Sequence, residues 1–141
     1  MNKDDLKEYL KNRYYDQIDW YDKKAIYNEK MYKGLQTIVA ILSVITPIML
    51  VAREEWLLWL AVVSSGIVAI GCALLKTFKY QENWINYRTT CETLRKEIHY
   101  YDAKLYDYHD TKDPEALFVE RVEALISREN TLWLISQKPK K

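Results

Sequence analysis

The chain has 141 residues, a formal net charge of +1 and two cysteines. Acidic and basic residues are interspersed, so the sequence lacks the one-signed basic surface that nucleic-acid binding uses, and we expect no nucleic-acid partner. The three glycines lie at or within apolar segments, and no Cys or His spacing fits a metal site, so we expect neither a phosphate-binding loop nor a cofactor.

The first predicted element is a cytoplasmic stalk helix within residues 1–33, capped by Asp4 or Asp5. Its length from about residue 4 to Lys33 is ~45 Å at 1.5 Å per residue. Gly34 marks the boundary to the next segment. Apolar or aromatic residues recur along one face of the helix at Leu6, Leu10, Tyr14, Ile18, Tyr21 and Ala25.

Residues 34–75 contain two apolar arms, 34–52 and 56–75, and neither arm has an ionisable side chain. Each is near the ~20 residues that a helix needs to cross the hydrocarbon core of a bilayer. The loop 53–55, Arg53-Glu54-Glu55, is charged and belongs at a membrane face. The sequence therefore predicts a transmembrane hairpin, with two buried helices of a soluble bundle as the alternative.

Basic residues flank the outer ends of both arms, whereas the connecting loop contributes only Arg53. This asymmetry predicts cytoplasmic termini and a multi-pass protein of the cell (inner) membrane, with the lipid bilayer as its main partner. The flanking basic residues are Lys23, Lys24, Lys30, Lys33, Lys76, Lys79 and Arg88.

The segment 76–141 begins with a second stalk helix that carries a heptad seam for about four repeats. This seam can pair with the first stalk, which we favour, or with another chain. It consists of Tyr80, Trp84, Tyr87, Cys91, Leu94, Ile98, Tyr101, Leu105 and Tyr108.

A loop at 109–113 precedes a third helix at 114–135, with Asp113 as N-cap and Pro114 at the first helical position. A basic tail, Lys138-Pro139-Lys140-Lys141, follows. The predicted fold class is an all-α membrane protein. Two long antiparallel helices form its transmembrane hairpin, and a third cytoplasmic helix packs on their stalks.

Charged residues on the second and third cytoplasmic helices are predicted to form ion pairs within the bundle. Antiparallel packing places Arg88 at the level of Glu129, and Glu97 at the level of Arg121. We expect these pairs to set packing and register, without an enzymatic role.

Small or weakly polar residues form one face on each apolar arm. The first is a pore or helix-contact face of Gln36, Ala40, Ser43 and Pro47, and Pro47 frees the carbonyl of Ser43 from its helical hydrogen bond. The second is a helix-packing seam of Ala61, Ser65, Ala69 and Ala73, whose spacing lets helices approach closely. Either face can serve an oligomer or a contact within one hairpin.

Several stretches in a fixed order resemble the SLATT superfamily over about residues 20–133. They are Trp20-Tyr21-Asp22-Lys23-Lys24-Ala25, Glu82-Asn83-Trp84, Tyr87-Arg88, Glu92-x-Leu94-x-x-Glu97, and Leu117-Phe118-x-x-Arg121-Val122-Glu123-x-Leu125-Ile126-x-x-Glu129-Asn130-x-x-Trp133. The resemblance implies a bacterial two-span effector that accompanies SMODS nucleotide cyclases and SLOG nucleotide sensors in conflict systems. It also implies a cytosolic sensor protein as partner.

By this resemblance we expect a homo-oligomeric membrane effector that forms pores or perturbs membranes in bacterial defence. The alternative is a membrane-anchored helical scaffold that recruits a cytosolic partner through its tyrosine-rich stalk. We do not expect an enzyme, because nothing in the sequence places His99 or His109 beside Ser127 or Ser136.

Overall fold

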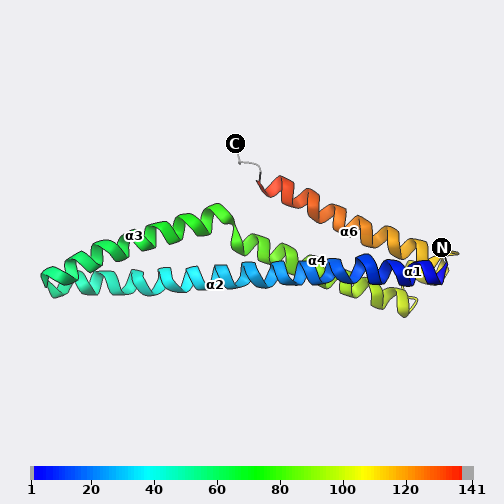
Figure 1. Ribbon diagram of the computed structural model, residues 1–141, viewed down its shortest axis with the longest axis horizontal. Coiled ribbons are helices and arrows are strands. Elements are labelled where there is room, and N and C mark those ends of the chain that lie inside the picture. Colours follow the sequence, from blue (N-terminus) through cyan, green and yellow to red (C-terminus); the bar gives the residue numbers. More distant parts are fainter. Residues whose placement is uncertain (1, 138–141) are drawn as a thin grey trace. The chain divides into compact units, whose positions relative to one another are not determined.

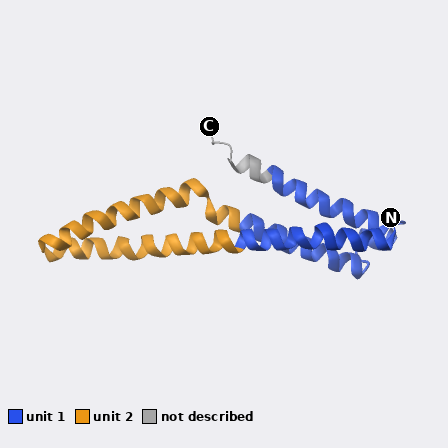
Figure 2. Ribbon diagram, viewed as in Figure 1, with its two compact units in different colours: residues 1–25, 85–141 blue, residues 26–84 orange. Residues whose placement is uncertain are grey.

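The computed structural model describes residues 2–137, with side chains as far as Thr131, and its regular structure there is all helical. The elements are α1 (Lys3–Tyr9), the π-helix η1 (Leu10–Tyr14), α2 (Tyr15–Ala52), α3 (Glu55–Phe78), α4 (Tyr80–Asp102), α5 (Asp107–Asp110) and α6 (Pro114–Gln137) (Figure 1). The chain divides into two compact units. Unit 1 contains residues 1–25 and 85–141, and unit 2 contains residues 26–84 (Figure 2).

The start of the chain corrects the predicted cap. Asn2 is the N-cap of α1, and its backbone N–H donates to Oδ2 of Asp5 at 3.3 Å. The apolar positions Leu6, Leu10 and Tyr14 are each four residues apart, so in a regular α-helix they drift around the axis by about 40° per step. The wider π-turn at η1 compensates this drift, which lets both Leu6 and Tyr14 be buried.

Unit 2 is a helical hairpin made by α2 from residue 26 onward and by α3. The turn is one residue shorter than predicted: Arg53 adopts a positive φ of 56°, and Glu54 is the N-cap of α3. Pro47 lies inside α2 without ending it. Nearby hydroxyls back-bond to the helix, since Ser43 Oγ donates to the carbonyl of Val39 at 2.7 Å.

Two contacts seven residues apart hold the arms of the hairpin together. The hydroxyls of Thr46 and Ser64 share a hydrogen bond at 2.5 Å, and Ser64 is buried. At Gly71 an added Cβ would lie only 2.6 Å from Cγ2 of Val39, so the close approach requires glycine here. A seven-residue interval is two helical turns, so both contacts lie on one seam.

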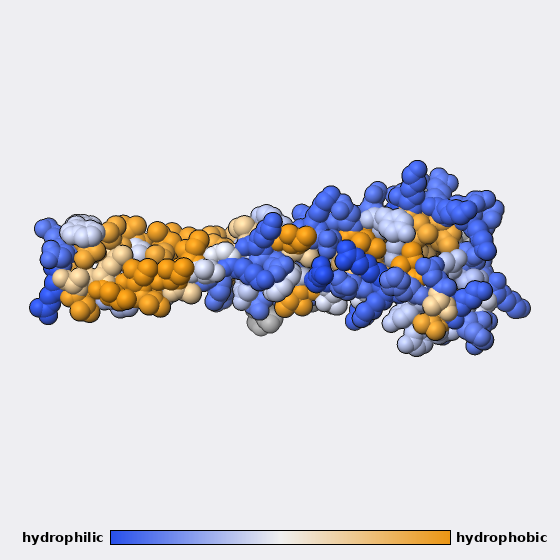
Figure 3. Space-filling view, turned by 90° about the horizontal axis from the view of Figure 1, so that it is seen from below, coloured by the Kyte–Doolittle hydropathy of each residue, from blue (hydrophilic) through white to orange (hydrophobic). Residues whose placement is uncertain are grey.

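Apolar side chains cover the outside of the hairpin over most of its length, and its tip is charged (Figure 3). Among the described residues, two helical segments are long and apolar enough to cross a membrane. They lie within Lys3–Ala52 and Glu55–Asp110, and only 0% and 17% of their most apolar windows are buried.

The second of the two long helices that we expected is interrupted after its apolar arm. Lys79 adopts the left-handed conformation, with φ 49° and ψ 39°, between α3 and α4. Nδ2 of Asn83 donates to the carbonyl of Phe78 at 3.1 Å, which satisfies one of the free acceptors at the end of α3. The break is therefore capped without a glycine or a proline.

Unit 1 packs the first helices of the chain against α4 and α6. Tyr14 OH donates to the carbonyl of Leu94 at 2.6 Å, and the rings of Trp20 and Tyr87 meet edge to face at 5.7 Å. The seam on α4 thus pairs within the chain. The buried apolar and aromatic residues of this unit are Leu6, Tyr14, Tyr21, Ala25, Tyr87, Cys91, Leu94, Tyr108, Phe118, Val122 and Ile126.

The heptad seam ends earlier than its spacing suggests. α4 stops at Asp102, and positive φ angles at Lys104 and Tyr106 turn the chain into the short helix α5. Leu105 is consequently exposed, whereas Tyr108 returns to the core. The next helix begins at Pro114 as predicted, and Oδ1 of Asp113 accepts the N–H of Ala116 at 3.0 Å. The basic tail 138–141 lies outside the described residues.

Candidate functional site

The predicted ion pair between Glu97 and Arg121 is present in unit 1. Nη1 of Arg121 donates to Oε1 of Glu97 at 3.4 Å, and the same carboxylate oxygen accepts the hydroxyl of Tyr108 at 2.5 Å. Arg121 also pairs with Asp107, and its guanidinium lies over the ring of Tyr108 at 5.3 Å. Glu97 is buried but fully partnered, so this cluster ties α4, α5 and α6 together.

Arg88 and Glu129, which we expected to pair with each other, have other partners. Arg88 Nη1 contacts Oδ1 of Asp22 at 3.1 Å, and Nη2 contacts Glu92 at 3.0 Å. Glu129 is 6% exposed and accepts the hydroxyl of Tyr21 at 3.2 Å. Burial of Glu129, which that hydrogen bond only partly offsets, raises the pKa of its carboxyl.

A stronger pairing at Glu123 was not predicted. Nε and Nη2 of Arg13 donate to its two carboxylate oxygens at 2.5 and 2.8 Å, and the hydroxyl of Tyr9 donates at 2.8 Å. The hydrogen bonds from Arg13 lower the pKa of Glu123. The sequence offered one signal, because Tyr9 and Arg13 are four residues apart and share a helix face. It gave no register for Glu123.

We expect opposite changes in the free energy of unfolding when the carboxyls of Glu129 and Glu123 are neutralised. Glu129 has a raised pKa, so its contribution to stability is present below about pH 4, near the unfolded value, and is lost as the pH rises through the folded value. Glu123 has a lowered pKa, so its contribution is present at neutral pH and is lost in acid. We expect Glu129→Gln to raise the free energy of unfolding at pH 7. Glu123→Gln should lower it by ~0.2–1 kcal/mol, since the pair is partly exposed.

Denaturant unfolding of the detergent-solubilised chain, followed by tyrosine circular dichroism, measures both changes. The two variants serve as matched controls, because each removes one carboxylate from α6 and keeps the shape of the side chain. Both differences from the native chain should shrink toward pH 3. A loss of stability in Glu129→Gln at pH 7 would contradict the inferred cost of burying this carboxylate.

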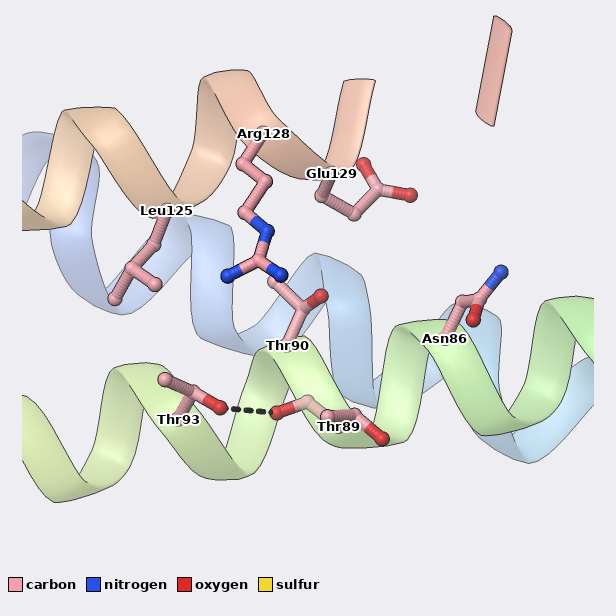
Figure 4. A pocket seen from close by; sticks show the side chains of 7 residues that line it. All are labelled: Asn86, Thr89, Thr90, Thr93, Leu125, Arg128 and Glu129. Atoms are coloured by element: carbon pink, nitrogen blue, oxygen red, sulfur yellow. Dashed lines mark hydrogen bonds between the residues drawn. The ribbon is translucent and has the colours of Figure 1, made fainter. Parts of the chain in front are cut away.

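A cavity of about 190 Å³ lies between α4 and α6 in unit 1 (Figure 4). The guanidinium of Arg128 extends from α6 toward the threonines of α4, whereas the carboxylate of Glu129 turns away. Thr93 Oγ1 donates to the carbonyl of Thr89 at 2.8 Å. The cavity is lined by Asn86, Thr89, Thr90, Thr93, Leu125, Arg128 and Glu129.

The described residues do not bring together a hydrolytic or metal-binding set. No group of three His, Cys, Asp or Glu residues that can hold a metal ion occurs among them. His109 contacts its neighbour Asp110 at 2.7 Å and is exposed, as is Ser127. The side chain of Ser136 lies outside the described residues.

The predicted faces of the hairpin lie differently from one another in unit 2. All four residues of the first face, Gln36, Ala40, Ser43 and Pro47, are exposed on α2. The second set is divided: Ala61 is buried against α2, whereas Ser65, Ala69 and Ala73 are exposed. The seam inside the hairpin uses Ala61, Ser64 and Gly71 instead, so α3 has small residues on two sides.

Comparison with known proteins gives one family. Residues 16–116 match the family described as "Protein of unknown function (DUF4231)", a range that includes both arms of the hairpin and all of α4. No curated protein and no solved structure matches the chain significantly. Because the match covers more than half of the 141 residues, the chain belongs to the DUF4231 family.

Proposed function

We propose that the protein is a homo-oligomeric membrane effector that opens a weakly selective pathway through, or otherwise perturbs, the bilayer. The hairpin of unit 2 spans the cell membrane, both termini lie in the cytoplasm, and copies associate through the outside of the hairpin. The protein acts by assembly and without enzymatic chemistry.

The exposure of the apolar helices supports the membrane location. A core helix of a soluble protein has the same composition but is mostly covered by protein, whereas the apolar windows here are 0% and 17% buried. Leaving so much contiguous apolar surface in water is unfavourable, and a hydrocarbon environment removes that cost. Arg53, Glu54 and Glu55 then lie at the outer face of the bilayer.

The observation that carries the assembly is the free outer face of α2. Thr46, Ser64 and Gly71 provide the contact within one hairpin, so Ala40, Ser43 and Pro47 remain available on the outside, whereas Gln36 lines a pocket with residues of α3 and α4. Small and weakly polar residues are the ones that transmembrane helices use to pack on one another. Packing of several copies places this face toward an axis, where Ser43 and the backbone at Pro47 can meet water without a buried charge.

The resemblance to the SLATT superfamily supports the biological role. By that resemblance the protein serves in a bacterial defence system, and a cytosolic sensor protein supplies the signal. A constitutively open pathway would kill the host, so the resting assembly is closed. Unit 1 is the element whose state such a partner biases.

Release of a small trapped ion from liposomes tests the pathway. Full-length protein reconstituted in liposomes is expected to release the ion in an activated state and to retain it at rest. Ser43→Leu should reduce release several-fold without dispersing the oligomer, because the larger apolar side chain narrows and dries the axis. Ser65→Leu should reduce release by dispersing the oligomer, because it widens a helix contact.

Val44→Leu is the matched control, since Val44 is the exposed apolar neighbour of Ser43 and leucine keeps its apolar character. It should leave both release and assembly unchanged. Absence of release under every condition, activating ones included, would contradict the pathway.

A second candidate function is a membrane-anchored scaffold. Exposed aromatic rings on unit 1, Tyr15 and Trp20 on α2 and Tyr106 before α5, favour it, because aromatic residues are enriched where proteins bind one another. Tight binding of a cytosolic protein to the full chain, together with the absence of ion release, would select the scaffold.

A further inference from the structure

A pocket of about 420 Å³ lies within unit 2, where α3 ends and α4 begins. The left-handed conformation of Lys79 redirects the chain at this point and separates the end of α3 from the first turn of α4. The pocket combines residues from α2, α3 and α4. Its lining residues are Tyr32, Gln36, Cys72, Leu75, Lys76, Lys79, Gln81 and Glu82.

The lining of this pocket is amphipathic along the direction of the hairpin. Cys72 and Leu75 contribute an apolar wall on α3, and Lys76 and Lys79 follow them toward the end of the helix. Lys76 forms no ion pair with any residue that the structure describes. The amide of Gln36 and the hydroxyl of Tyr32 add hydrogen-bonding groups from α2.

The start of α4 adds a further preference for negative charge. The first N–H groups of a helix have no acceptor within the helix, and they carry the positive end of its dipole. Lys79, which precedes α4, has no side-chain oxygen that can cap them. Gln81 and Glu82 of this first turn line the pocket.

Aromatic rings mark the same level of unit 2 as interfacial. Tyr32 and Trp84 stack with ring centroids 6.4 Å apart, and Nζ of Lys33 lies 5.4 Å from the centroid of the Trp84 ring. Tyrosine and tryptophan concentrate where a membrane meets water. The pocket thus lies where the apolar arm ends, at the depth of lipid headgroups in the proposed orientation.

We propose that this pocket binds one anionic glycerophospholipid from the cytoplasmic leaflet. The lipid phosphate lies between Lys76 and Lys79, and an acyl chain descends along Cys72 and Leu75. The proposal rests on the membrane-spanning hairpin proposed above. Basic pockets between transmembrane helices on the cytoplasmic side suit this class of ligand.

The charge of the lining selects the kind of headgroup. Two lysines and the carboxylate of Glu82 leave a formal charge of +1, which a phosphodiester with a single negative charge neutralises. A phosphomonoester carries more charge at neutral pH and would meet Glu82 with an uncompensated negative charge. We therefore expect phosphatidylglycerol to bind more tightly than phosphatidic acid, and phosphatidylcholine to bind most weakly.

Native mass spectrometry of the full-length, detergent-solubilised protein, titrated with each lipid, measures this order. Lys76→Gln and Lys79→Gln should each weaken binding of phosphatidylglycerol about fivefold, the effect of one basic residue near an anionic surface. Lys30→Gln is the control, because Lys30 is an exposed lysine of α2 that does not line the pocket. It should leave the affinity unchanged.

Two further measurements distinguish a lipid site from nonspecific electrostatic attraction and from a site for a free phosphate compound. Cys72→Trp changes no charge but fills the apolar wall, so it should weaken lipid binding as well. Glycerol 3-phosphate, which has no acyl chain, should fail to displace the lipid. Displacement by glycerol 3-phosphate would show that the pocket binds a soluble phosphate compound. Equal losses of phosphatidylglycerol affinity in Lys30→Gln and Lys76→Gln would show that the preference comes from the overall charge of the surface. Either outcome overturns the proposal.

Flotation of the same protein with alkali-washed liposomes separates this inference from the proposed function. Protein that does not float contradicts the membrane-spanning hairpin and the lipid site together. Protein that floats but binds phosphatidylglycerol and phosphatidylcholine equally contradicts the lipid site alone.

Discussion

A membrane-impermeant maleimide applied to intact cells is expected to label a cysteine placed at Glu54 and to leave one placed at Asn12 unmodified. Glu54 is exposed at the tip of the hairpin, and Asn12 is exposed in unit 1. The lysines at the outer ends of both arms predict that those ends lie in the cytoplasm. Labelling should therefore be all or none, and Asn12→Cys should react only after the membrane is permeabilised.

The native cysteines are poor reporters for this measurement. Cys91 is 0% exposed, its Sγ lies 3.7 Å from the carbonyl oxygen of Ile18, and burial raises the pKa of its thiol, which disfavours the reactive thiolate. Cys72 is exposed on α3, so the test uses a Cys72→Ser background. The reverse labelling pattern would reject the orientation. Reaction of both engineered cysteines in intact cells would reject the hairpin.

The apolar arms could be predicted from the sequence because each lacks ionisable side chains over a length that few soluble helices need. Their contact face could not. The predicted seam advanced by four residues from Ala61 to Ala73, and four residues exceed one turn by about 40°, so Ser65, Ala69 and Ala73 turn away from α2. The observed contact residues Ser64 and Gly71 are seven positions apart and therefore lie on one side of α3. They can be recognised as contact residues only once their partners, Thr46 and Val39, are known.

The breaks at the two ends of α4 could not be predicted from the sequence. Lys79 adopts a left-handed conformation that lysine rarely takes, and neither glycine nor proline marks the position. At the other end, Leu105 continues the heptad spacing, yet the helix stops at Asp102. Periodicity describes which residues would share a face if a helix continued. It carries no information on where tertiary packing ends the helix.

The ion pairs show a similar division. Distances along antiparallel helices correctly placed Arg121 beside Glu97, where both partners face inward. Arg88 lies on α4 between two neighbouring helices and turns to Asp22 of α2, so its level on the axis did not determine its partner. Glu129 is left with Tyr21, a pairing that requires the rotation of α6 as well as its register.

Removal of the Phe118 side chain should cause the largest loss of stability in unit 1. Phe118 is 0% exposed, and its ring contacts those of Tyr14 and Tyr101 with centroids 5.4 and 5.3 Å apart. Truncation of a buried phenylalanine to alanine costs about 3–5 kcal/mol through lost burial and the cavity left behind. Phe118 packs α6 against η1 and α4, and the neighbouring side chains have little room to move into the cavity.

Phe78→Ala is the matched control, because the chain has two phenylalanines and Phe78 is 51% exposed at the end of α3. Its truncation removes the same atoms with little change in burial and should cost well under half as much.

The loss of ~3–5 kcal/mol expected for Phe118→Ala is a large share of the ~5–15 kcal/mol that stabilises a typical domain. Phe118→Ala should therefore detach α6 first, seen as rapid proteolysis within residues 114–131 while the hairpin stays intact. If Phe118→Ala and Phe78→Ala shift the denaturation midpoint equally, α6 does not pack on Tyr14 and Tyr101 in solution, and unit 1 is not a three-helix bundle.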